Sequence, residues 1–501
     1  MMTSDRNEVL WKPEHLGLPI GGSPHAISAC LPLWRDVIGY EEGDPRVINA
    51  LTCGYPRFFL HPMVRKLTEQ FLKKKNLRDR YALIFTSHSV ADKARTWLVA
   101  KGITTECHTL AGGEGGATVV TVPISAEKMA RFYWRISGQG LSSRAAEDIL
   151  NNTPIESDQS NGNQSAKSGI RETLAEIHGV QPGDVYLCAS GMSAIFSLIQ
   201  SARQLDADAT HVQIGFPYVD TWKDLENFSP DRRFLNSVES GDLLSEFESI
   251  SGSVGLILSE CPSNPLLETP DPELLRDISK KRGAILAIDD TVASSVNIRA
   301  LPYADVVTTS LSKWFNGRGD ALGGALILNP QSDHYQKLGD ILNQEGCWDD
   351  DLYERDARVI LENSSHFASR VHQAGLNAGR LITFLENHPR VERLHFTDAS
   401  NSAAYAKLTR AGSTIPALIS MELNGGEKAA SRFYDNLMVS KGPSLGTDWT
   451  LACPYTLLAH YDELEWVESC GVSRNLIRIS VGSEPADELL DIFGQALDSV
   501  D

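Results

Sequence analysis

The feature that most constrains the fold is a series of short apolar runs in the middle of the chain, separated by stretches with helical spacing. The runs cover residues 211–216, 254–259, 284–288, 305–309 and 325–328. Each has the length of a buried strand, and residues 273–282 have the pattern of a helix between two of them. Strands that alternate with helices predict an α/β fold, in which a mostly parallel central sheet is covered by helices on both faces.

The chain has 501 residues, too many for a single hydrophobic core, and a polar stretch divides it. Residues 151–168 contain almost no large apolar side chain and are predicted to be a flexible linker. Before the linker, residues 1–150 are predicted to form an N-terminal region with an extended arm and an inserted α/β segment. After it, we expect the central-sheet domain over residues 169–370 and a smaller α+β C-terminal domain over residues 371–501.

Charge and composition narrow the classes of partner. The formal net charge of −19 argues against nucleic acid and anionic membranes, because both bind clustered Lys and Arg. No stretch approaches the roughly 18 apolar residues of a membrane span, and residues 1–10 lack the apolar core of a signal peptide. The cysteines form no CxxC pair and the histidines no HExxH motif. We therefore expect a cytoplasmic protein that acts on small molecules and has no metal site.

Polar side chains follow the predicted strands at their carboxyl ends. Five stand at or shortly after such an end: Tyr218, Glu260, Asn264, Asp289 and Ser310. In open α/β sheets, ligands bind in the crevice outside the carboxyl ends of the strands. We therefore predict that these side chains surround a ligand site at one edge of the sheet.

Three features at this edge point to one kind of cofactor. Lys313 follows a strand and two serines, and a lysine in a partly desolvated pocket can form an imine with an aldehyde. Asp289 ends another strand, where a carboxylate can keep a ring nitrogen protonated. Residues 189–195 open a helix whose backbone N–H groups suit a phosphate, and Gly191 permits close approach. Each feature alone also fits an ordinary surface lysine, a capping aspartate or a helix start. Together they predict a cofactor with an aldehyde, a basic ring nitrogen and a phosphate.

Several motifs stand in a set order along the second part of the chain: ASGM (189–192), SECPSNP (259–265), IDDT (288–291), SLSKWFNGRGD (310–320), SLGT (444–447) and NLIRISVGSE (475–484). Together they resemble the Cys/Met-metabolism family of fold-type I pyridoxal 5'-phosphate (PLP)-dependent transferases. Other segments resemble the long fungal-type cystathionine γ-synthases: SPHAISACLPLWRDVIGYEEG (23–43), GYPRFFLHP (54–62), ISGQGLSSR (136–144) and GFPYVDT (215–221). The resemblance implies a fold-type I architecture, PLP as cofactor, and residues 169–370 as the PLP-binding domain.

The resemblance also implies how the chain would hold PLP. Lys313 would form the Schiff base and shuttle protons, and Asp289 would pair with the pyridinium. The phosphate would be held by a group of small and polar residues, namely Gly191, Met192, Ser310 and Ser312.

Further contacts are implied on the ring and across a subunit interface. Tyr218 would stack on the ring and assist proton transfer, and Asn264 would lie near the phenolic oxygen. Tyr55 and Arg57 would reach the phosphate bound by a neighbouring subunit, and Tyr55 also counts among the catalytic candidates. These two residues therefore predict a homodimer or homotetramer.

On the substrate side, the resemblance implies that Arg478 binds the α-carboxylate, with Ser444 and Glu260 beside it. The expected reaction is γ-substitution on an O-acyl-L-homoserine, with O-acetyl-L-homoserine as the expected ester. It would pass through a vinylglycine-type intermediate, and cysteine would add to give cystathionine. Several positions depart from the common pattern, among them Asp290, where Asn is usual. Residues 65–168 form an insertion for which the sequence predicts no role.

The residues leave other reactions open. A carbon nucleophile such as a β-keto acid would give a non-proteinogenic amino acid, and a γ-lyase would release a 2-oxo acid and ammonia. A remote alternative is serine-based acyl transfer, because residues 310–313 fit S-x-x-K and residues 442–446 fit G-x-S-x-G. The companion motifs that such enzymes need are missing, so we favour the PLP chemistry.

Overall fold

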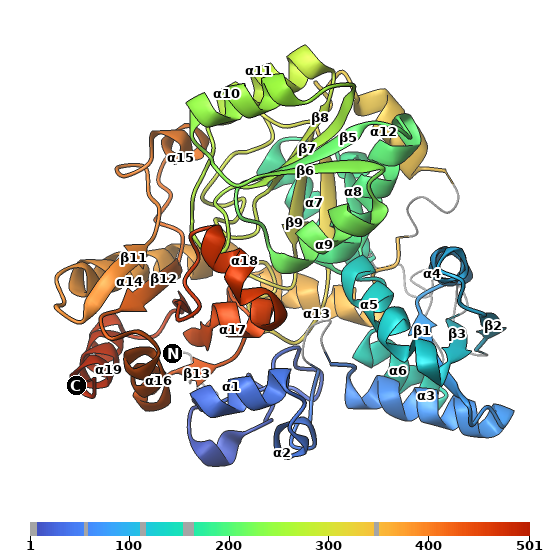
Figure 1. Ribbon diagram of the computed structural model, residues 1–501, viewed down its shortest axis with the longest axis horizontal. Helices are drawn as coiled ribbons and strands as arrows, with labels where there is room; N and C mark the ends of the chain where they lie inside the picture. Colours follow the sequence, from blue (N-terminus) through green and yellow to red (C-terminus); the bar gives the residue numbers. More distant parts are fainter. Residues whose placement is uncertain (1–7, 55–58, 111–116, 154–164, 345–349, 501) are drawn as a thin grey trace.

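The structure is a computed structural model that describes residues 8–54, 59–110, 117–153, 165–344 and 350–500. Three sheets organise these residues, with three, seven and five strands in chain order. Figure 1 shows the seven-stranded sheet between helices, and the two smaller sheets on opposite sides of the view. None of the helices in the described ranges is long and apolar enough to cross a membrane.

The seven-stranded sheet is the predicted central sheet. Its strands are β4 (Val185–Cys188), β5 (Thr210–Ile214), β6 (Asp231–Leu235), β7 (Val254–Glu260), β8 (Ile285–Asp289), β9 (Val306–Ser310) and β10 (Gly324–Leu328). Their order is β4-β10-β9-β8-β7-β5-β6, and β10 runs antiparallel to both of its neighbours while the other pairs are parallel. The prediction of a mostly parallel sheet is confirmed.

The predicted strands all occur, with bounds that differ by one or two residues. The sequence analysis missed the two edge strands, β4 and β6. Strand β6 begins with Asp231, Arg232 and Arg233, which face solvent or are half-buried, so it contains no apolar run. Strand β4 has only four residues, which is at the lower limit of a recognisable pattern.

Helices cover both faces of the central sheet: α7 (Ala166–His178), α8 (Gly191–Leu205), α9 (Val219–Phe228), α10 (Ser240–Ser249), α11 (Pro272–Arg282), α12 (Tyr335–Leu342) and α13 (Glu354–Ser364). Leu286 and Ile288 of β8 pack in a core cluster with α7, α10 and α11. Ile285 and Ala287 pack in a second cluster with α8, α9 and α12. Because successive side chains of a strand point to opposite faces, a doubly covered strand is apolar throughout.

Residues 62–151, called the inserted segment below, form a small α/β unit. Its elements are α3 (Pro62–Lys75), β1 (Arg80–Phe85), α4 (His88–Ala100), β2 (Glu106–Thr109), β3 (Thr118–Pro123), η2 (Ile124–Ala126), α5 (Glu127–Ser137) and α6 (Ser143–Asn151). Strands β1 and β2 both pair antiparallel with β3. The arm before it contains η1 (Pro13–His15), α1 (Trp34–Glu41) and α2 (Pro45–Ile48). The region before the central sheet therefore contains both helices and strands.

The C-terminal part mixes strands and helices around a five-stranded sheet of order β11-β12-β15-β14-β13. The strands are β11 (Val391–His395), β12 (Leu418–Leu423), β13 (Ser440–Lys441), β14 (Leu451–Pro454) and β15 (Ile477–Ser480). The helices are α14 (Phe367–Glu386), α15 (Ala403–Leu408), α16 (Gly426–Asn436), α17 (Tyr455–His460), α18 (Leu464–Ser469) and α19 (Ala486–Asp498), with a short 3₁₀ turn η4 (Tyr461–Glu463). A further 3₁₀ turn, η3 (Pro182–Asp184), directly precedes β4 of the central sheet.

All three predicted domain limits fall inside helices, and the first, between residues 150 and 151, lies at the last residue of α6. Helix α7 begins at Ala166, within the predicted linker 151–168, because Ala166 and Ile170 are already buried against the core. Helix α14 runs through the predicted limit between residues 370 and 371, since its buried stripe includes both Arg370 and Val371. Of the predicted linker, residues 154–164 lie outside the described residues.

Candidate active site

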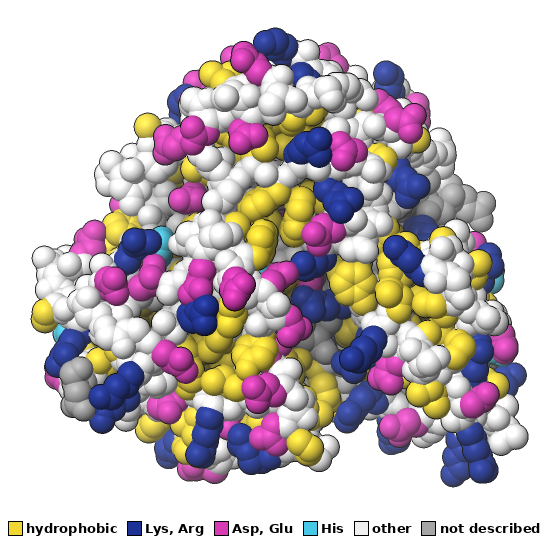
Figure 2. All heavy atoms as spheres, in the orientation of Figure 1, with side chains coloured by type: hydrophobic (Ala, Val, Ile, Leu, Met, Phe, Trp, Pro, Cys, Tyr) yellow, Lys and Arg dark blue, Asp and Glu magenta, His cyan; other side chains and the backbone are white. Residues whose placement is uncertain are grey.

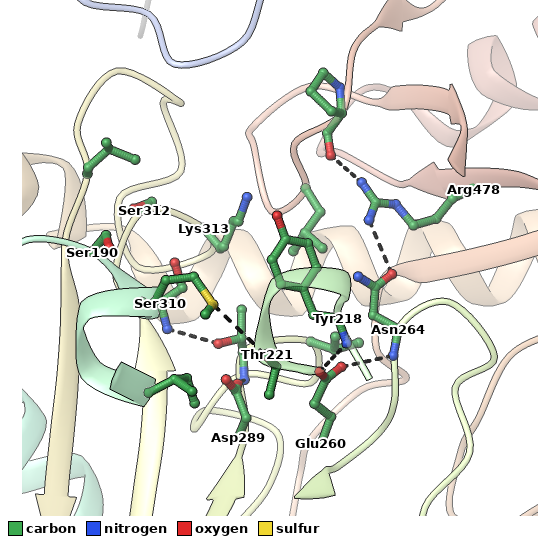
Figure 3. Close-up of a pocket in the computed structure, with 18 residues that line it drawn as sticks. Ser190, Tyr218, Thr221, Glu260, Asn264, Asp289, Ser310, Ser312, Lys313 and Arg478 are labelled. Carbon is green, nitrogen blue, oxygen red and sulfur yellow. Dashed lines mark hydrogen bonds between the residues drawn. The ribbon is translucent and has the colours of Figure 1, made fainter. Parts of the chain in front are cut away.

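A pocket lies at the carboxyl edge of the central sheet, between that sheet and the C-terminal part (Figure 3). The predicted residues that line it are Gly191, Met192, Tyr218, Glu260, Asn264, Asp289, Ser310, Ser312, Lys313 and Arg478. Ser444 reaches the same place through its hydroxyl, which accepts a hydrogen bond from Lys313 Nζ at 3.2 Å. Tyr55 and Arg57 lie outside the described residues.

One wall of the pocket is the first turn of α8. Ser190 caps this helix, since its Oγ accepts a hydrogen bond from the Ser193 backbone N–H at 3.1 Å. Glycine is required at position 191, because a Cβ there would lie 2.8 Å from Ser310 Cβ. The absent side chain lets the strand end and the helix N-terminus approach each other. The first N–H groups of α8 and the Ser310 hydroxyl therefore form a cradle suited to an anion such as phosphate.

Ser312 is held more tightly than the sequence implied. Its Oγ donates to the Gly323 carbonyl at 3.2 Å and accepts from the Gly323 N–H at 3.0 Å. These bonds fix the loop that carries Lys313. Ser310 keeps its hydroxyl toward the pocket, while its N–H donates to Thr291 Oγ1 at 2.8 Å.

The base of the pocket is acidic. Asp289 ends β8 directly opposite Glu260, the last residue of β7, and Asp290 follows it. Burial raises the pKa of Asp289. Burial and the Asp289 charge together raise the pKa of Glu260 to about 8 and that of Asp290 to about 7. Glu260 and Asp289 both line the pocket, and two crowded carboxyl groups favour a cation beside them, which a protonated ring nitrogen at Asp289 would supply.

Arg478, on β15, forms the opposite wall of the pocket from Lys313 (Figure 3). Its guanidinium lies 4.9 Å from the centre of the Tyr455 ring. Its Nη2 donates to the Ser444 carbonyl at 3.1 Å and to the Pro443 carbonyl. These contacts hold a cation at the pocket wall, where it can bind a carboxylate.

A chain of hydrogen bonds connects Arg478 to Tyr218. Arg478 Nη1 donates to Asn264 Oδ1 at 3.1 Å, and the Asn264 N–H donates to Glu260 Oε2 at 3.2 Å. The Tyr218 N–H donates to the other oxygen of Glu260, Oε1, at 2.5 Å. The Asn264 amide oxygen therefore faces Arg478, and Glu260 joins two pocket segments. Tyr455 was not predicted, although it directly follows β14 and the strand-end rule points to it.

The geometry does not favour serine-based acyl transfer. Ser444 has Lys313 beside it, but the histidine that follows in the sequence, His460, points elsewhere. His460 Nδ1 pairs with Glu463 at 2.8 Å, and its ring packs on Phe216 with 5.3 Å between ring centres. Lys313 therefore contacts the Ser444 hydroxyl, whereas His460 is held by other residues and does not serve as a base for Ser444.

The pocket fits PLP on three counts that come from the structure. The cradle beside Gly191 suits the phosphate, the acidic base at Asp289 suits the ring nitrogen, and Lys313 reaches the space between them. These residues would hold the cofactor, and Lys313 would supply the amine that its aldehyde requires. The same arrangement leaves room for an amino acid whose carboxylate meets Arg478.

Comparison with known proteins agrees with this assignment. Residues 158–498 match the family described as Cys/Met metabolism PLP-dependent enzyme. The chain is 30% identical to a cystathionine gamma-synthase of Neurospora crassa, over 97% of this chain and 98% of that protein. It is 31% identical to an L-2-amino-4-chloropent-4-enoate dechlorinase/desaturase of Streptantibioticus cattleyicolor, over 96% and 97%.

A solved structure gives the same result for the fold. The cystathionine gamma synthase of Xanthomonas oryzae pv. oryzae, in complex with aminoacrylate and cysteine, aligns with a TM-score of 0.58 at 25% identity. The alignment covers 69% of this chain and 90% of that one. The pocket and the motifs of the present chain agree with these matches. The chain belongs to the Cys/Met metabolism family of PLP-dependent enzymes, is cystathionine gamma-synthase-like, and uses PLP as its cofactor.

Proposed function

We propose that this enzyme catalyses γ-substitution on an O-acyl-L-homoserine, with O-acetyl-L-homoserine as the first substrate to test. The observation that carries the proposal is the convergence of Lys313 and Arg478 on one pocket from opposite walls. Both contact the Ser444 segment, through Lys313 Nζ to Ser444 Oγ at 3.2 Å and Arg478 Nη2 to Ser444 O at 3.1 Å. A carboxylate bound at Arg478 brings the α-, β- and γ-carbons of the substrate toward Lys313.

Each residue has a separate task in this proposal. PLP, when bound, withdraws electrons from the substrate α-carbon. Lys313 Nζ removes the proton from Cα and then exchanges protons at Cβ, so that the γ-acyloxy group can leave. Arg478 holds the α-carboxylate and thereby fixes which substrate bond faces Lys313. Asp289 keeps a proton on the ring nitrogen, and the Tyr218 side chain stacks on the ring and assists proton transfer.

Cysteine is the nucleophile we propose first, with cystathionine as product. The support is the relative from Neurospora crassa, named cystathionine gamma-synthase and similar over almost the full length. The Streptantibioticus relative is named a dechlorinase/desaturase of L-2-amino-4-chloropent-4-enoate, a substrate with chlorine on its γ-carbon. The alternatives are a carbon nucleophile such as a β-keto acid, and γ-elimination to a 2-oxo acid and ammonia.

We further propose that the enzyme works in the cytoplasm as a homodimer or homotetramer. Tyr55 and Arg57 match the family segment that reaches a neighbouring subunit, and they would complete the phosphate site there. Sedimentation of the active enzyme tests this, because an active monomer would contradict it.

The reaction is tested by incubating the holoenzyme with O-acetyl-L-homoserine, with and without cysteine, and identifying the products by mass spectrometry. Cystathionine that forms only when cysteine is present supports the proposal. A 2-oxo acid at the same rate with and without cysteine would assign a γ-lyase instead. Consumption of the ester in neither case would contradict the proposed substrate.

A further inference from the structure

The inserted segment shares its hydrophobic core with the cofactor domain. Leu83 and Phe85 of β1 pack in the same cluster as Phe196 of α8 and Phe228 of α9. The other face of this small sheet packs on α3 and α6. One side of the segment is therefore continuous with the helical layer that forms the pocket wall (Figure 1).

An aromatic cluster joins four helices at this contact. Tyr133 of α5 meets Phe196 of α8 edge to face at 6.3 Å and Phe228 of α9 at 5.9 Å. Phe196 and Phe228 are 4.9 Å apart, also edge to face, and Trp97 of α4 lies 6.0 Å from Phe228. Such pairs favour defined ring geometries, so the cluster fixes α5 relative to α8 and α9.

Helix α5 also makes an ion pair with α9. Arg135 Nε lies 2.9 Å from Asp220 Oδ1, and the Asp220 side chain is fully buried. Asp220 lies in the first turn of α9, two residues after Tyr218 and directly before Thr221, both of which line the pocket. Removing one partner from such a pair leaves a charge buried without compensation, which forces the surrounding segment to move.

The carboxyl end of α5 contacts the amino end of α8. Gly138 ends α5 with a φ of 66°, and its carbonyl accepts a hydrogen bond from Ser190 Oγ at 2.8 Å. A Cβ at position 138 would lie 2.4 Å from Ser190 Oγ and 2.7 Å from the Ser193 nitrogen. Ser190 is the N-cap of α8, and α8 provides the phosphate cradle. Any side chain at position 138 would therefore push on this cradle.

We propose that α5 of the inserted segment is a clamp that sets the affinity for PLP. Through Gly138 it holds α8, whose first turn forms the phosphate cradle. Through Arg135 it holds the start of α9, next to Tyr218. Binding is tighter when the contacting groups are already in place, because less ordering is needed on binding. Arg135 and Gly138 are positioning residues in this proposal. The inference does not depend on which nucleophile the enzyme uses.

The test compares the rate at which PLP leaves the holoenzyme on dilution, followed by its visible absorbance, in four variants. Arg135→Met breaks the ion pair, Arg135→Lys keeps the charge, and Gly138→Ala crowds the N-cap of α8. Arg131→Met is the matched control, since Arg131 lies one turn earlier on α5 in an exposed pair with Glu127. Visible circular dichroism of the bound cofactor reports the ring environment near Tyr218, and thermal unfolding of each holoenzyme reports general stability.

Arg135→Met and Gly138→Ala should each release PLP roughly tenfold faster or more. This is the lower end of the loss of affinity seen at metal sites when a residue that positions a ligand is removed. Both should alter the visible circular dichroism band, whereas Arg131→Met should stay within about twofold of the wild type. Arg135→Lys should fall between them. If Arg135→Met fails to fold, Gly138→Ala and Arg135→Lys decide by the same measurement. Folded variants that release PLP at the wild-type rate, or an equal effect of Arg131→Met, would overturn the proposal.

Discussion

The strand-end pocket and the inserted segment are built by different means. Most of the pocket residues stand at or just after the ends of strands β7, β8 and β9 or at the start of α8, and Arg478 comes from β15. In the inserted segment, helix α5 reaches the same site through buried contacts such as Arg135–Asp220 and Gly138–Ser190. Figure 2 shows apolar side chains over this segment and beside the central hollow of the same face. In our two proposals, the pocket supplies the reacting groups and the inserted segment supports them.

The largest effect should come from removing the amine of Lys313, which we propose as the reacting group of the pocket. Lys313→Ala takes away the group that moves protons at Cα and Cβ, so kcat/KM should fall by about 10³-fold or more. Steady-state kinetics with O-acetyl-L-homoserine would measure this, and the visible cofactor band should change with it. Lys337→Ala, an exposed lysine on α12, is the matched control and should behave as the wild type. A fully active Lys313→Ala enzyme would remove the basis of the assignment.

The next largest effect is expected at the opposite wall. Arg478→Ala removes a charge-assisted contact to the substrate carboxylate, so KM for the amino-acid substrate should rise roughly 10²-fold. Arg474→Ala serves as the control, because Arg474 lies four residues earlier in an exposed pair with Glu468. If KM stays unchanged in Arg478→Ala, the carboxylate must bind elsewhere.

The sequence predicted those parts of the site that depend on local pattern. Lys313, Asp289 and Tyr218 each follow an apolar run, and a buried strand is recognisable from such a run alone. The helix start at Gly191 was predicted from the helical run that follows it, and the structure brings all of these residues to one pocket. The central sheet and its two helical layers follow from the same alternation of strands and helices.

The sequence did not predict what depends on distant packing. The hydrogen bond between Lys313 and Ser444 joins residues 131 positions apart, and no local pattern encodes it. The hydrogen bond from the Tyr218 N–H to Glu260 was missed for the same reason, since it joins residues 42 positions apart. Nor does any motif say that α5 of the inserted segment lies on α8 and α9, because that contact is made by ordinary apolar and aromatic residues.

Glu260 lies in the pocket, but its carboxylate contacts backbone N–H groups and so supports the segments at Tyr218 and Asn264. Glutamine at this position keeps one acceptor oxygen and turns the other into a donor facing an N–H group. One of the two segments, at Tyr218 or at Asn264, should therefore loosen, and kcat/KM of Glu260→Gln should fall roughly tenfold. A KM rise larger than the kcat loss would indicate loosening at Asn264, which contacts Arg478. Glu268→Gln, outside the pocket, is the control; unchanged kinetics in both variants would reject the supporting role.

The smallest expected effect concerns a carboxylate outside the pocket, Glu41 of α1. Burial, with repulsion from Asp462, raises the pKa of Glu41 from 4.5 to about 8, although Arg135 on α5 opposes this. Between these two pH values the unfolded chain releases a proton that the folded chain keeps, so stability falls as pH rises through this window. Glutamine cannot ionise and avoids this loss.

Glu41→Gln should therefore match the wild type near pH 5 and be more stable near pH 8. Thermal unfolding of the holoenzyme at both pH values measures the difference, and Glu42→Gln, at the next and more exposed position, is the control. Unlike Glu260→Gln, this variant should leave kcat and KM unchanged, because Glu41 stands at the end of α1 and does not line the pocket. An equal stability gain at both pH values would mean that ionisation of Glu41 does not cause the loss of stability at high pH. A change in kinetics would instead extend the support of the active site from α5 to the arm that carries α1.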